Sequence, residues 1–288
     1  MKMNRLATAT LIVTGVLVSV APADAPMGSP TAYLGAGNWG LGAEYGYGQT
    51  DLESSGTVAE VTGFLDTSWT QHFKIDNLKS NMAFGTIAYG LTDTWDLFAR
   101  LGAADAGSTI VVSPSFVRAE ERRGDFDGSF GLAWGVGTRA TLHKSGPWSV
   151  GGLVQFTWFQ PGDSDFSIRP DPLIPDESWA GKAKLHYWQA QASLAAAFQA
   201  NTWRFWAGPF VRYTQGDMDF SGTTSIAGLT GTINWCSSID DSFQVGGHFG
   251  ANWKVCDQFN LWMEGQIASD SWLVGVGLVL VPEKAFGI

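Results

Sequence analysis

The sequence has few charged residues, only two cysteines and, after its amino terminus, no long apolar segment. Charged residues make up 15% of the 288 residues. The longest later apolar stretch, residues 272–281, has ten residues, which is too short for a membrane-spanning helix but suits a membrane-spanning strand. No G-x-S-x-G or H-E-x-x-H motif occurs. These absences argue against a helical membrane protein and leave no familiar hydrolase motif.

The amino terminus predicts a secretory signal peptide over residues 1–23. Lys2 and Arg5 precede an apolar run over residues 6–20, and an A-x-A pattern ends at Ala23. We expect cleavage after Ala23, because the competing site two residues later would place Pro26 next. An uncleaved anchor helix is the alternative, but the run is shorter than the roughly 20 apolar residues that a spanning helix needs.

The composition of the remaining chain is acidic, aromatic and rich in glycine. Removal of Lys2 and Arg5 leaves 15 basic against 27 acidic residues, a net charge of −12, so nucleic acid is not expected as a partner. The chain has 36 Gly, 14 Trp and 18 Phe, yet its mean hydropathy is +0.01. This composition is unusual for an ordinary soluble enzyme.

Alternation of apolar and polar residues is the main structural signal. A strand presents successive side chains to opposite faces, whereas a helix repeats every 3.6 residues. Around residues 95–103 one face reads Trp95, Leu97, Ala99, Leu101 and Ala103, and the other reads Asp96, Phe98, Arg100 and Gly102. The apolar face suits contact with lipid and the opposite face does not, so this segment is predicted to be a membrane strand.

The same pattern predicts ten strands within residues 33–281, preceded by an N-terminal segment over residues 24–32 and followed by a tail over residues 282–288. The strands are expected near residues 33–47, 79–91, 95–103, 130–142, 148–158, 188–198, 203–213, 243–253, 259–267 and 272–280. Short connections, such as residues 92–94, alternate with long ones over residues 51–78, 107–124, 160–183 and 215–241. Short periplasmic turns and long external loops are typical of bacterial outer-membrane barrels.

The predicted fold is therefore all-β, a transmembrane antiparallel up-and-down β-barrel of about ten strands. Lipid offers no hydrogen-bond partner, so every backbone amide must be paired within the sheet and no edge can remain open. A soluble sandwich or lipocalin-like barrel is the alternative, and it would bury the apolar face inward. The polar faces carry glycine, glutamine and isolated charges, which fit a narrow lumen better than a solvated exterior.

One hairpin resembles a known family. Residues 89–102, YGLTDTWDLFARLG, resemble the strand, tight turn and strand that recur in small bacterial outer-membrane barrels of the OmpA/OmpW-like and porin-like superfamily. The resemblance covers this hairpin closely and the rest of the chain only through its pattern. It implies the fold and a location in a Gram-negative-type outer membrane, and it transfers no functional residue.

Two sets of residues follow from the strand faces. Charged residues expected to face the lumen are Glu44, Asp96, Arg100, Arg139, Arg204, Arg212, His248 and Glu264. Aromatic residues expected to form girdles at the two membrane interfaces are Trp95, Trp148, Trp158, Trp188, Trp203, Tyr213, Phe243, Phe259 and Trp272. Inward charges of both signs either pair and fill the barrel or line a conducting lumen, and the many inward glycines keep the second interpretation open.

The predicted loops and the two cysteines are candidates for further sites. Acidic residues cluster in the loops over residues 160–183 and 215–241, without the ligand spacing of a known calcium loop. A proteolytic site would have to combine Asp217, Asp219 and His248, although His248 lies within a predicted strand. Cys236 and Cys256 are expected on opposite sides of the membrane, too far apart for a disulfide.

The expected function is that of an integral outer-membrane barrel. It is either a narrow porin-like channel or a structural and surface-interaction protein, and an outer-membrane hydrolase at the external rim is the alternative. No catalytic residue, metal or cofactor is expected. The expected partners are outer-membrane lipids and lipopolysaccharide, the barrel-assembly machinery and, for a channel, small solutes or ions.

Overall fold

The structure is a computed structural model that describes residues 25–63, 65–114, 121–168, 178–226 and 228–282; the predicted signal peptide lies outside these ranges. The described residues contain no helix long and apolar enough to span a membrane. The described residues form eleven strands: β1 (Trp39–Thr62), β2 (Leu65–Thr92), β3 (Trp95–Val112), β4 (Arg122–Ser145), β5 (Trp148–Gln160), β6 (Ser164–Ile168), β7 (Ser178–Ala200), β8 (Trp203–Ile226), β9 (Leu229–Cys256), β10 (Phe259–Ala268) and β11 (Ser271–Leu280).

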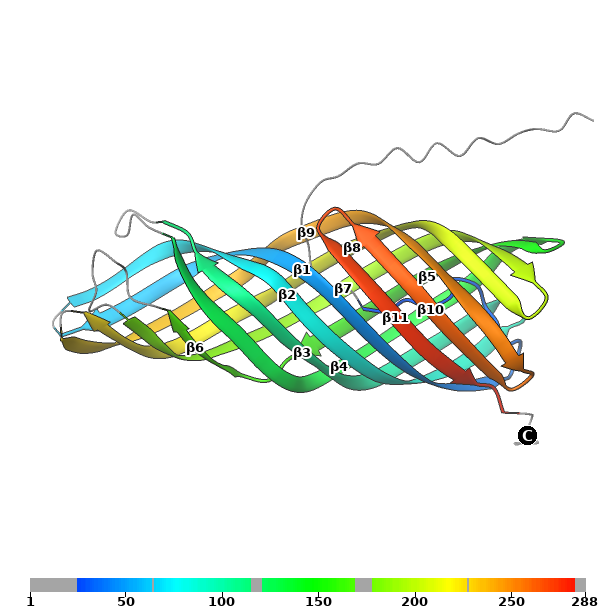
Figure 1. The fold of residues 1–288 in the computed structure, drawn as a ribbon, viewed down its shortest axis with the longest axis horizontal. Helices are drawn as coiled ribbons and strands as arrows, with labels where there is room; N and C mark the ends of the chain where they lie inside the picture. Colours follow the sequence, from blue (N-terminus) through cyan, green and yellow to red (C-terminus); the bar gives the residue numbers. More distant parts are fainter. Residues whose placement is uncertain (1–24, 64, 115–120, 169–177, 227, 283–288) are drawn as a thin grey trace, which may run out of the picture.

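The strands form one closed antiparallel sheet (Figure 1). Except for β5 and β6, each strand pairs with its neighbours in the chain, and β1 pairs with β11 to close the ring. Strands β5 and β6 both lie between β4 and β7 and form one interrupted line around residues 161–163. The predicted ten-strand barrel is thus confirmed, with β5 and β6 sharing one position in the wall.

The wall has ten strands at one level and eight at the other. Residues 41–50 of β1 pair with β11, whereas residues 54–62 pair directly with β9. The short β10–β11 hairpin ends between these two levels, and the long hairpins continue past it in Figure 1. We call the part that contains β10 and β11 the ten-strand section, and the continuation the eight-strand section.

The exterior of the ten-strand section is apolar. Strands β10 and β11 have ten residues each, the length of a tilted membrane strand. The exposed large apolar side chains lie almost entirely in this section, for example Leu41, Leu97, Trp134, Val154 and Val276. A band of this kind fits acyl chains rather than water, so this section spans the membrane.

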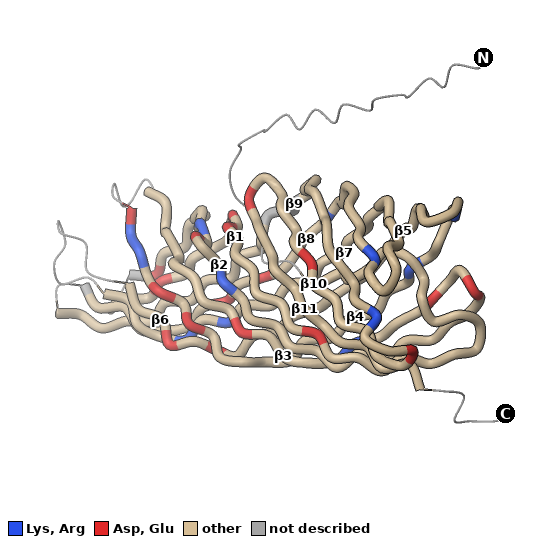
Figure 2. Tube along the Cα trace, turned by 45° about the vertical axis from the view of Figure 1, so that its right-hand side comes forward, with Lys and Arg blue, Asp and Glu red and all other residues tan. Residues whose placement is uncertain are grey.

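The eight-strand section has the opposite arrangement, with apolar side chains inside and polar ones outside. On β2 the side chains of Phe73 and Ile75 are buried, and those of His72 and Lys74 are exposed. Figure 2 shows acidic residues along the strands at the end that carries β6. This section therefore projects beyond the membrane on the side of the long hairpins, which is the external side in outer-membrane barrels.

Aromatic rings fill the interior of the eight-strand section. The ring of Trp235 lies 4.6 Å from that of Phe220, 4.7 Å from that of Phe73 and 5.4 Å from that of Phe166 (centroid distances). All four side chains are at most 2% exposed. An eight-stranded barrel is just wide enough for side chains to fill it, and these rings form a packed core.

Two sequence-based expectations about the strands are wrong. Most of the predicted loops over residues 51–78, 107–124 and 215–241 are continuations of the strands. The sequence pattern predicts loops there because the apolar side chains face inward, the reverse of the lipid-facing pattern, where the exterior changes from lipid to water. Register shifts accompany the inversion, as between Asp76 and Lys79 on β2. The first strand begins at Trp39 rather than at residue 33, because residues up to Leu34 lie inside the barrel and residues 35–38 form a partly exposed turn.

Candidate functional site

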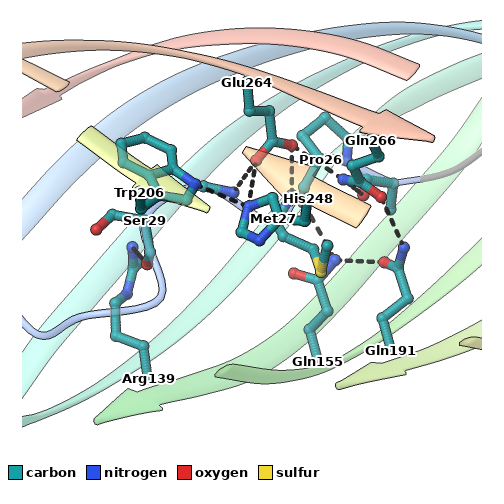
Figure 3. A network of polar contacts seen from close by, with 12 residues as sticks. Pro26, Met27, Ser29, Arg139, Gln155, Gln191, Trp206, His248, Glu264 and Gln266 are labelled. Carbon is teal, nitrogen blue, oxygen red and sulfur yellow. Dashed lines mark hydrogen bonds and ion pairs between the residues drawn. The ribbon is translucent and has the colours of Figure 1, made fainter. Parts of the chain in front are cut away.

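Residues 25–34, here called the N-terminal segment in place of the predicted range 24–32, lie inside the ten-strand section. Ala25, Met27, Ser29, Thr31 and Leu34 are at most 5% exposed. Figure 3 shows Pro26, Met27 and Ser29 among polar side chains of the wall. A ten-stranded wall encloses more space than an eight-stranded one, and this segment occupies much of that space.

Glu264 on β10 is the most direct anchor of the segment. Its two carboxylate oxygens accept hydrogen bonds from the backbone N–H groups of Met27 and Gly28, both at 2.7 Å. The Glu264 side chain is fully buried. Hydrogen bonds to an ionised, buried acceptor are among the stronger ones in proteins, so this contact fixes the position of the segment.

Glutamines and an arginine hold the backbone around Pro26. Arg100 donates to the carbonyl oxygen of Pro26 at 2.6 Å, and Gln155 donates to the same oxygen at 3.2 Å. Gln266 donates to the carbonyl oxygen of Ala25 at 3.1 Å, and the Ala25 N–H donates to Gln189 at 3.2 Å. The backbone here is paired with side chains from four strands, which compensates for its removal from water.

A second group of contacts holds the other end of the segment. The Tyr33 N–H donates to Asp96 at 3.0 Å, and the Arg139 guanidinium lies 4.7 Å from the Tyr33 ring centroid. Arg139 also lies 4.0 Å from the Asp96 carboxylate. Arg204 donates to the Thr31 hydroxyl at 3.1 Å. These charges are thus used both in pairs within the wall and as partners of the segment.

Trp206 and His248 extend the contacts of Glu264. Trp206 donates from Nε1 to Nε2 of His248 at 2.9 Å, and the same His248 nitrogen lies 3.3 Å from Glu264. Figure 3 shows the three side chains converging beside the N-terminal segment. A buried histidine with these neighbours belongs to the hydrogen-bonded filling of the barrel.

Two inward glycines leave room for the segment. A Cβ atom on Gly46 would lie 2.6 Å from Cγ of Pro26, and one on Gly151 would lie 2.6 Å from the carbonyl oxygen of Pro30. Both distances are shorter than ordinary contacts. Some of the space that inward glycines leave in the lumen is therefore taken up by the N-terminal segment.

The structure places all eight charged lumen candidates on the inside of the wall. Six of them lie around the N-terminal segment, and Glu44 joins that group through its ion pair with Arg100 at 3.6 Å. Arg212 lies apart, at the level where β10 and β11 end, and donates to Gln244 and Ser271. The sequence interpretation named an N-terminal segment but did not place it inside the barrel, and it missed the inward Trp206.

The predicted girdle residues lie on the outside of the ten-strand section. Those that are more than a third exposed are Trp95, Trp148, Trp203, Phe243 and Trp272, and those that are partly covered by neighbouring rings or strands are Trp158, Trp188, Tyr213 and Phe259. Trp158 and Trp188, for instance, lie in a row of rings with Trp134 and Phe156. Their positions at both ends of the membrane strands match an interfacial role.

The residues considered for a hydrolase are not brought together. Asp217 and Asp219 lie on β8 with side chains outside the eight-strand section, where Asp217 is 3.3 Å from His186, while His248 lies in the lumen. Cys236, on β9 rather than in a loop, and Cys256 are free thiols. No group of three or more His, Cys, Asp or Glu side chains suitable for a metal occurs within the described ranges.

No family model and no curated protein matches this sequence. Similar solved structures include the outer-membrane protease OmpT of Escherichia coli, with 10% identity, a TM-score of 0.44 and coverage of 84% of this chain and 97% of that one. OprG of Pseudomonas aeruginosa has 11% identity and a TM-score of 0.44, with coverage of 86% of this chain and 99% of that one. The toluene transporter TbuX of Ralstonia pickettii has 12% identity and a TM-score of 0.36, with coverage of 86% of this chain and 89% of that one.

These likenesses carry no conclusion about activity, because identity and TM-score are low in every case. The fold is established by the wall itself, which is closed, antiparallel and apolar on the outside of the section with membrane length. Only a closed barrel lets strands satisfy their backbone groups in lipid. The chain is an integral β-barrel protein of the bacterial outer-membrane type.

Proposed function

We propose that the chain is a closed, non-conducting outer-membrane barrel that serves as a structural and surface-interaction protein. The observation that carries this proposal is that the interior is filled at two successive levels. The N-terminal segment and its polar partners fill the ten-strand section, and an aromatic core fills the eight-strand section. A solute would have to displace both.

The porin-like channel is the second candidate, and the polar wall around the N-terminal segment is the observation that favours it. If the segment were released, Arg100, Arg139, Asp96 and Glu264 would line a hydrophilic lumen. The aromatic core beyond it would still close the path, since Phe73 and Trp235 are at most 1% exposed. We therefore favour the closed barrel, and we also propose that the chain is not an enzyme.

The expected processing and partners fit this proposal. Cleavage after Ala23 would leave Asp24 directly ahead of Ala25, which is 0% exposed inside the barrel. Only one residue would then precede the first described residue of the segment. We propose outer-membrane lipids, lipopolysaccharide and the barrel-assembly machinery as partners, and no nucleic acid, because the mature chain is strongly acidic.

Planar-bilayer recording of the refolded full-length mature chain tests the proposal. We expect no stepwise conductance from the parent chain or from a variant lacking residues 25–34. Conductance is expected only when that deletion is combined with Phe220→Ala and Trp235→Ala, which would open the aromatic core. Steps from the parent chain would contradict the closed barrel, and steps from the deletion alone would support the channel.

A further inference from the structure

A polar hollow lies on the outside of the barrel, next to the external edge of the apolar band. It has a volume of about 410 Å³ and is lined from four neighbouring strands by Tyr47, Asn77, Lys79, Asn81, Asp105, Ser108, Thr109 and Asp127, with Gly107. Tyr45, which is 45% exposed in the apolar band, donates to Asn81 at 2.6 Å. The hollow therefore lies at the boundary between the lipid-facing and water-facing surfaces.

Two irregularities of the sheet coincide at this hollow. The β2–β3 register shifts between Asp76 and Lys79, and the β3–β4 register shifts between Ala104 and Ala106. Such bulges bend a strand and redirect its side chains, and they are frequent beside functional sites. Here they separate the side chains of β2, β3 and β4 and so create the depression.

Two charged side chains of the hollow are available to a ligand. The Ser108 hydroxyl is not, because it is shielded from water on the inward-facing side of β3, in register with the buried Phe126. Within the described part of the chain, the Lys79 ammonium and the Asp127 carboxylate form no ion pair or side-chain hydrogen bond, and both residues are exposed. By contrast, Asp105 already accepts hydrogen bonds from the backbone and side chain of Asn81.

The mixture of groups indicates the class of ligand. The lining offers hydroxyl, amide, ammonium and carboxylate groups together with the Tyr47 ring. Adjacent hydroxyls of a sugar both donate and accept hydrogen bonds, so they can pair with such a mixture. Asp105 and Asp127 outnumber Lys79, and Asp125 is adjacent through its bond with Thr109, which disfavours a phosphate group.

We propose that this hollow is a binding site for a neutral hexose unit. The exposed side chains of Lys79 and Asp127 provide its hydrogen-bonding groups. Its place at the membrane boundary allows two sources of the same chemistry, the sugar headgroup of a membrane glycolipid and a soluble saccharide. The site is independent of whether the lumen conducts, because its lining faces outward.

The test uses the full-length mature barrel in phosphatidylcholine nanodiscs. One arm titrates maltotriose by calorimetry, a second measures retention of monoglucosyl diacylglycerol by native mass spectrometry, and a third titrates inorganic phosphate. The site variant is Lys79→Gln with Asp127→Asn. The matched control is Lys182→Gln with Asp165→Asn, an exposed pair on β7 and β6. Heat-modifiable migration on gels verifies that each barrel is folded.

We expect saturable binding in at least one sugar arm, weakened about tenfold or more in the site variant, as for loss of hydrogen bonds to charged groups, and unchanged in the control. Binding in the first arm identifies a soluble saccharide, and selective retention in the second identifies a glycolipid headgroup. The proposal is overturned if folded protein binds neither sugar, if binding is equal in the site variant and the control, or if only phosphate binds.

Discussion

The anchoring of the N-terminal segment by Glu264 leads to a quantitative prediction. In Glu264→Gln the amide oxygen can still accept one of the two hydrogen bonds from Met27 and Gly28, but the amide nitrogen would face the other N–H. Loss of a charge-assisted hydrogen bond and the burial of an unpaired donor together cost about 3 kcal/mol. The population of the released segment should therefore rise about a hundredfold.

The population of the released segment is measured by the rate of maleimide labelling at Ser29→Cys, in a background with Cys236→Ser and Cys256→Ser. Ser29 is 3% exposed in the barrel, so labelling requires release. Glu53→Gln, on the outside of β1, is the matched control and should leave the rate unchanged. The reasoning is refuted if Glu264→Gln labels at the rate of the parent chain while remaining folded.

Two further predictions concern the eight-strand section. Trp235→Ala removes the ring that contacts Phe73, Phe166 and Phe220. In denaturant titrations it should lower the free energy of unfolding by about 3–5 kcal/mol, whereas Asn234→Ala, on the outer face, should change that free energy little. Equal effects of the two substitutions would contradict a packed core. Cys236 lies outside the membrane-spanning section, and its hydrogen bond with Asp219 raises the pKa of its thiol. The thiolate is the reactive form of cysteine, so the pH midpoint of the alkylation rate of Cys236 should lie above the usual thiol value. This midpoint should fall in Asp219→Asn. A midpoint that does not move in this variant would exclude Asp219 as the cause.

The membrane part of the fold was predictable because lipid imposes a simple rule on the sequence. Once helices are excluded, the alternation of Trp95, Leu97, Ala99 and Leu101 with more polar residues fits few structures other than a strand with one face toward lipid. The structure has these four residues on the outside of the barrel. The eight-strand section was missed because the same alternation continues there with apolar residues inward. Phe73 and Ile75 belong to this inward apolar alternation. A search for outward apolar faces alone assigns them to a loop.

The filling of the lumen was less predictable. The inward orientation of the charged residues could be predicted from the faces of the strands. Their contacts with the N-terminal segment could not, because this segment has no periodic pattern and its position depends on contacts with strands that are distant in the sequence. Glu264, for example, is more than 230 residues from Met27 in the chain. The inward position of Gly46 was evident from the sequence, whereas the reason for it, the ring of Pro26, was not.

The central claim is that the N-terminal segment lies inside the ten-strand section. Oxidative cross-linking of Pro26→Cys with Gly46→Cys tests it, because a Cβ atom on Gly46 would be 2.6 Å from Cγ of Pro26 and disulfides require Cβ atoms about 4 Å apart. The native cysteines are replaced by serine, and cleavage after Glu44 separates the two peptides unless they are joined. We predict a joined pair for Gly46→Cys and separate peptides for the outward neighbour Tyr45→Cys; equal yields at both positions would contradict the claim.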